Sequence, residues 1–108
     1  MKAFGCSLPE VLQERIMGPI GATKTWEWHG YENSWSELNG KQIQSVSGGA
    51  HWGGGLWIST MDQARVGQLM LNKGRWKDKE VIPEKWIEEC TRPCSIAPFY
   101  GYLWWLNN

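Results

Sequence analysis

The sequence predicts an α+β protein with three helices, short hairpins and a C-terminal strand. Three segments place apolar residues at helical spacing, two of them behind capping residues and the third behind a proline, and the stretches between them are rich in aromatic, glycine and turn residues. With 108 residues, 42% of them apolar, the chain can bury one modest core. We therefore expect a single domain over residues 1–108.

The first helix is expected to begin at a capping box. Ser7 and Glu10 stand three residues apart, so the serine side chain can accept a hydrogen bond from the Glu10 amide while the glutamate reaches back. Gly18 and Pro19 are expected to end the helix. Its apolar face consists of Leu8, Val11, Leu12 and Ile16.

Residues 22–52 predict loops and short strands. Asn33 and Ser34 are expected to interrupt any longer strand, and Asn39 and Gly40 to form a turn. A strand over residues 41–46 is expected to follow that turn.

The second helix is expected from the caps Ser59 and Thr60 to about Leu71. Asp62 and Arg65 are expected to pair on its solvent-exposed face. Gln68 and Asn72 extend that face, and the buried face is expected to hold Ala64, Gly67, Met70 and Leu71, widened by Val66 and Leu69. A left-handed stop over residues 72–74 ends the helix.

A charged hairpin tip at residues 77–80 leads to a third helix, in which Pro83 fits the first position. Pro93 ends that helix, and its narrow apolar stripe is Ile82, Trp86, Ile87 and Cys90. Residues 99–106 predict a strand that is apolar on both faces, so we expect it to lie inside a sheet or between layers.

Composition excludes several classes of partner. Eleven basic and eleven acidic residues cancel, so the excess of positive charge that nucleic acid requires is missing, and no apolar run approaches the length of a membrane span.

The N-terminus has no apolar signal-peptide region, which predicts a cytoplasmic location. Cys6, Cys90 and Cys94 lack zinc or redox spacing, so we expect neither a metal nor a cofactor.

Residues 48–55 include five glycines, which let a ligand or a neighbouring ring approach the backbone closely. The segment has neither a Walker nor a dinucleotide-binding pattern. A ligand contact and a contact with a neighbouring aromatic ring both stay open. The nine tryptophans can likewise stack on sugars and flat ligands or fill the core. The candidate ligand-binding residues are His51, Trp52, Gly53, Gly54 and Trp57.

Nucleophilic catalysis needs a hydroxyl beside a base. Ser47 and Ser59, with His51 as the base, are candidates by residue type. The chain has no Gly-x-Ser-x-Gly elbow and no Ser-x-x-Lys, so the residues alone assign no nucleophile.

Residues 53–74 resemble the serine hydrolases of the class C β-lactamase and penicillin-binding-protein superfamily. The shared pattern is Gly-Gly-Leu, then Ser/Thr, then x-x-Asp-x-Ala-Arg, then a leucine-rich turn ending in glycine; Val66 replaces the family's usual phenylalanine. Residues 8–21, 81–86 and 100–105 match further segments in the same order. The resemblance covers nearly the whole chain and implies a partial β-lactamase-like fold, the central-to-late part of the parent domain.

The family's Ser-x-x-Lys and Tyr-x-Asn precede the first helix, and its Lys-Thr-Gly or His-x-Gly follows the last strand. Here Tyr31-Glu32-Asn33 and His51-Trp52-Gly53 imitate two of these motifs at the wrong places in the order, and we interpret both as chance matches. The resemblance therefore implies a truncated, catalytically inactive relative.

We expect this relative to form a homo-oligomer through its C-terminal strand and exposed apolar faces. Two alternatives remain. One is a tryptophan-rich module that binds a small molecule or carbohydrate, and the other is a minimal serine esterase with a relocated site.

Overall fold

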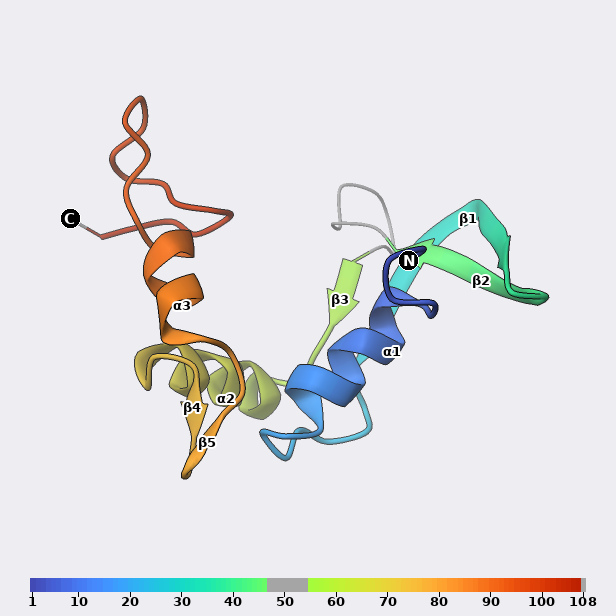
Figure 1. The fold of residues 1–108 in the computed structure, drawn as a ribbon, viewed down its shortest axis with the longest axis horizontal. Helices are drawn as coiled ribbons and strands as arrows, with labels where there is room; N and C mark the ends of the chain where they lie inside the picture. Colours follow the sequence, from blue (N-terminus) through green and yellow to red (C-terminus); the bar gives the residue numbers. More distant parts are fainter. Residues whose placement is uncertain (47–54, 108) are drawn as a thin grey trace. The chain divides into compact units, whose positions relative to one another are not determined.

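The computed structural model describes residues 1–46 and 55–107. These residues form three helices and two small antiparallel sheets, which confirms the α+β class (Figure 1). The chain divides into two compact units, Met1–Arg65 and Val66–Asn108. The expectation of a single domain stays a prediction, and each unit is described by itself.

The first unit begins with α1, Leu8–Leu12, which continues as one π-helical turn, η1, over Gln13–Met17. The predicted capping box is confirmed: the Glu10 amide donates to Ser7 Oγ at 3.4 Å, and the Ser7 amide donates to Glu10 Oε2 at 2.8 Å. Met17 and Ile20 are almost completely buried and form the apolar centre of this unit.

The sheet of the first unit has the order β2-β1-β3, with β1 at Glu27–Leu38, β2 at Lys41–Val46 and β3 at Gly55–Trp57. The predicted turn at Asn39 and Gly40 is confirmed, since both have positive φ, which suits a tight hairpin. The predicted strand over residues 41–46 is confirmed as β2.

The prediction that Asn33 and Ser34 interrupt the strand was wrong, because β1 runs through both. The pairing register shifts between Gly30 and Trp35, as in a β-bulge, which accommodates extra residues without ending the strand. Ser34 Oγ lies within hydrogen-bonding distance of the carbonyls of Tyr31 (2.6 Å) and Ser45 (2.8 Å) and so ties the bulge to β2.

The second helix, α2, covers Thr60–Leu71 as predicted, but its buried face was predicted incorrectly. Asp62, expected in solvent, is fully buried in the first unit, where the protein itself supplies its hydrogen-bond donors. Leu69 is fully buried in the second unit, whereas Leu71 is 80% exposed, and Ala64 and Gly67 are exposed as well.

The second unit continues with the hairpin of β4, Arg75–Trp76, and β5, Lys79–Glu80, followed by α3 at Glu84–Cys90. The predicted left-handed stop is confirmed by φ values of 55° at Lys73 and 84° at Gly74. Pro83 is the N-cap of α3, one position before the one predicted for it. Ile87 and Cys90 are buried as expected, whereas Trp86 of the same predicted stripe is exposed.

The C-terminal strand predicted over residues 99–106 was wrong. After α3 the backbone turns back on itself in a segment that we call the C-terminal hook, residues 93–107 (Figure 1, orange to red). Gly101 and Tyr102 lie against the end of α3, where the Tyr102 amide donates to the Cys90 carbonyl at 2.8 Å. Leu103 then takes a φ of 62°, which breaks the extended conformation that a strand needs.

Candidate functional site

Five of the predicted site residues lie outside the described part of the chain: Ser47, His51, Trp52, Gly53 and Gly54. The structure places the other two, Ser59 and Trp57, in the first unit.

Ser59 stands at the start of α2 and acts as a helix cap. Its Oγ accepts a hydrogen bond from the Asp62 amide at 3.2 Å, the contact typical of an N-cap serine. Because this hydroxyl orients the first turn of a helix, its position is explained by a structural role.

Trp57 is about half exposed at the end of β3. Its ring lies 4.5 Å from the ring of His29 on the paired strand β1, at a tilt of 48°. His29 Nε2 in turn lies 3.0 Å from Glu27 Oε2. The predicted ligand-binding tryptophan thus offers a ring face beside a histidine that the sequence analysis did not select.

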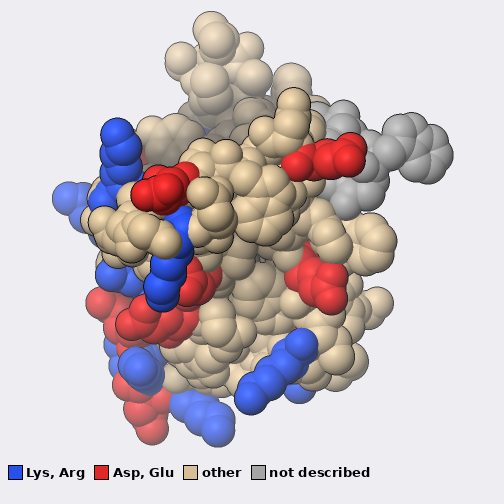
Figure 2. All heavy atoms as spheres, turned by 90° about the vertical axis from the view of Figure 1, so that its right-hand side faces the viewer, with Lys and Arg blue, Asp and Glu red and all other residues tan. Residues whose placement is uncertain are grey.

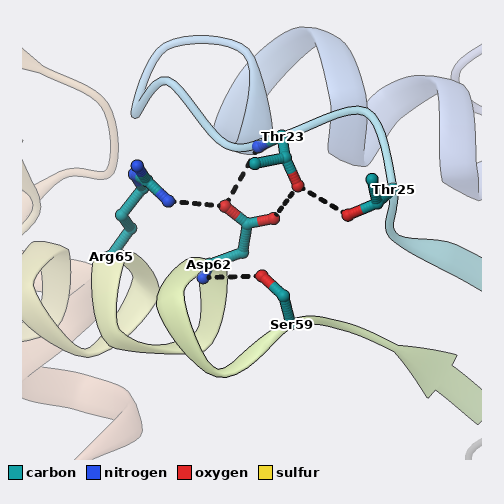
Figure 3. Close-up of polar contacts among 5 residues, drawn as sticks. All are labelled: Thr23, Thr25, Ser59, Asp62 and Arg65. Atoms are coloured by element: carbon teal, nitrogen blue, oxygen red, sulfur yellow. Dashed lines mark hydrogen bonds and ion pairs between the residues drawn. The ribbon is translucent and has the colours of Figure 1, made fainter.

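A polar cluster in the described part of the first unit centres on Asp62 (Figure 3). Its Oδ1 accepts from the Thr23 amide at 3.0 Å and from an Arg65 guanidinium nitrogen at 2.8 Å, and its Oδ2 accepts from the Thr23 hydroxyl. The Thr23 and Thr25 hydroxyls lie 2.7 Å apart. The predicted pairing of Asp62 with Arg65 is confirmed, although the carboxylate is buried and not exposed.

These contacts keep Asp62 ionised. The hydrogen bonds from Thr23, side chain first and backbone second, lower the pKa of Asp62 below its ordinary value, with smaller contributions from Ser59 and Arg65. Both carboxylate oxygens accept from protein donors, so the cluster is suited to fixing the start of α2 against the segment before β1.

A hollow of about 620 Å³ lies beside α1 in the first unit. The indole nitrogen of Trp26 donates to Gln13 Oε1 at 3.2 Å, which orients the ring at the hollow. An aromatic face beside amide, carboxylate and ammonium groups is a lining that suits a sugar or a similar polar ring. The lining residues are Pro9, Glu10, Gln13, Glu14, Lys24 and Trp26.

The sequence carries no signal that predicts this hollow. It forms only when residues 9–14 and 24–26 come together, and the capping box to which Glu10 belongs indicates the start of a helix, not a binding site. Trp26, two residues after Lys24, was the only local signal, and such a pair is too common to select a site.

Neither the face drawn in Figure 2 nor the grouping of metal ligands among residues 1–46 and 55–107 adds a further site. On the face drawn in Figure 2, Lys and Arg lie among Asp and Glu and do not gather into a patch of one sign. In the described ranges, no three His, Cys, Asp or Glu side chains are grouped so as to hold a metal ion. Within the same ranges, no helix has the length and apolar content to cross a bilayer.

No model of a known protein family matches the sequence, and no curated protein matches it.

Proposed function

We propose that this chain is a catalytically inactive relative of the class C β-lactamase and penicillin-binding-protein serine hydrolases, and that it acts by self-association. The observation that carries this proposal is the amount of exposed aromatic surface. Trp35, Trp57, Trp86 and Trp105 each expose more than half of their area, whereas the buried apolar residues of the described chain number five. Large exposed apolar surfaces mark sites of association.

The motif that carries the family resemblance supports a framework role for this part of the chain. In that motif Ser59 caps α2, and Asp62 binds both Arg65 and the backbone amide of Thr23. Each of these side chains holds the first unit together, as expected of a segment that supports a cleft in the parent enzymes without supplying its nucleophile.

Light scattering over a concentration series, combined with fluorophosphonate labelling, tests both parts of the proposal. We expect a mass above 12.4 kDa that rises with concentration, and no covalent adduct. A monomer at high micromolar concentration contradicts self-association, and a labelled serine contradicts inactivity.

A carbohydrate-binding module is the second candidate, favoured by the hollow beside Trp26. A sugar stacked on this ring would change its fluorescence, so the change should be lost in Trp26→Ala. Trp35→Ala is the matched control, because Trp35 is exposed and lies outside the lining. A flat response to a sugar panel contradicts this candidate.

For the location of the chain we propose the cytoplasm. Cys6, Cys90 and Cys94 are all unpaired thiols, and thiols remain reduced in that compartment. Fractionation of cells that express a tagged chain tests this assignment, and recovery from a secretory fraction contradicts it.

A further inference from the structure

We infer that the chain self-associates through the side chains of the C-terminal hook, with two copies meeting hook to hook in an isologous dimer. This inference rests on the proposed self-association and names its surface. It replaces the strand pairing that the sequence predicted, because the structure forms no strand over residues 99–106.

The hook pairs several of its own backbone hydrogen-bonding groups internally. The Tyr100 amide donates to the Ala97 carbonyl at 2.9 Å, and the Leu106 amide donates to the Phe99 carbonyl at 2.8 Å. The Gly101 amide donates to the Trp104 carbonyl at 2.9 Å. A sheet edge recruits another chain through a row of unpaired backbone groups, so a segment folded in this way recruits a partner through its side chains instead.

Those side chains are large, apolar and turned to solvent. Ile96 is 93% exposed, Leu103 87% and Trp105 76%. Packing among the rings holds part of the surface in place: Phe99 stacks on Trp105 at 5.9 Å, and Tyr102 lies 6.1 Å from Trp86 of α3.

The exposed area is large enough for a stable dimer. The hook surface consists of Trp86, Ile96, Phe99, Tyr102, Leu103, Trp104 and Trp105. With about 200 Å² for each large side chain, the exposed fractions amount to roughly 900 Å². A standard interface takes about 800 Å² from each partner.

The charge of the hook points to a second copy as the occupant. Residues 93–107 contain no Lys, Arg, Asp or Glu. In an isologous interface each surface meets its own copy, so a surface of one charge sign would repel itself, whereas an uncharged apolar surface carries no such penalty. At the end of α3 beside the hook, Glu89 and Arg92 bind each other at 2.9 Å.

The test compares Leu103→Lys with Leu71→Lys by sedimentation equilibrium. Both are exposed leucines of the second unit that receive the same charge, but Leu71 lies in α2, outside the hook. We expect Leu103→Lys to raise the dimer dissociation constant by about tenfold or more, and Leu71→Lys to leave it near that of the wild type. Far-UV circular dichroism checks that both variants fold.

Each outcome has one meaning. A dimeric wild type with equal effects of the two substitutions overturns the hook interface and leaves the proposed self-association standing. A monomeric wild type overturns both. If Leu103→Lys does not fold, Ile96→Lys replaces it in the same comparison, because the Ile96 side chain is almost fully exposed.

Discussion

The same substitution at two glycines seven residues apart should change stability in opposite directions. Gly67 lies inside α2, and a Cβ added there meets no atom within 4 Å. Alanine is favoured over glycine in a helix interior by about 0.5–1 kcal/mol. Gly67→Ala is therefore expected to increase the free energy of unfolding by that amount.

Gly74 ends the same helix in a conformation that alanine cannot adopt without strain. Its φ is 84°, and an added Cβ would stand 1.9 Å from the carbonyl oxygen of Ile82. The hairpin is held in place because the Val81 and Ile82 amides both donate to the Gly74 carbonyl, at 2.9 and 3.0 Å. The left-handed strain of about 1–2 kcal/mol and the loss of these hydrogen bonds together predict a destabilisation of about 3 kcal/mol.

Urea denaturation followed by circular dichroism measures both effects, at one protein concentration so that self-association contributes equally. The unfolding free energies of the two variants should differ by about 4 kcal/mol, with unchanged denaturant slopes. If Gly74→Ala is as stable as the wild type, the turn between α2 and β4 does not have the described conformation. If Gly67→Ala is destabilised, Gly67 lies in a contact that this account lacks.

Three further predictions concern the first unit and the candidate nucleophiles. The hydrogen bonds of Thr23 lower the pKa of Asp62, so the stabilising contribution of this carboxylate is complete above the ordinary value of 3.8 and lost as the pH falls through the lower folded-state pKa. The urea midpoint should therefore fall less steeply between neutral pH and about pH 3 in Asp62→Asn than in the wild type. An equal pH dependence of the two midpoints contradicts this. Ser59→Ala removes a helix cap, so it should lower the free energy of unfolding by about 1 kcal/mol in thermal unfolding and leave fluorophosphonate labelling unchanged. A drop in labelling identifies Ser59 as a nucleophile. His51→Ala should leave background ester hydrolysis unchanged. Loss of this hydrolysis in the variant would support the relocated esterase.

The sequence predicted elements whose signals are local. The capping box at Ser7, the turn at Asn39 and Gly40, and the left-handed stop at Lys73 all depend on residues within a few positions, and all three are confirmed. Helix α2 was placed correctly for the same reason.

The errors have distant causes. Asp62 is buried because it binds Thr23, 39 residues earlier, and helical periodicity alone cannot reveal that partner. Residues 99–106 have strand composition, but Tyr102 binds the carbonyl of Cys90, which folds the segment against α3. In both places a tertiary contact overrides the local preference.

The predicted ligand-binding site stays a prediction: Trp57 is about half exposed, and His51, Trp52, Gly53 and Gly54 lie outside the described residues. The hollow at Trp26 has no signature in the sequence because two separate segments form it. A hollow of this kind can be recognised only after folding has brought α1 next to the start of β1.

Native mass spectrometry of the chain treated with a fluorophosphonate probe tests self-association and inactivity together, because one spectrum reports both assembly and acylation. We expect an oligomer at the unmodified mass. A monomer with one probe molecule attached would contradict both parts of the account, and the labelled peptide would identify the nucleophile.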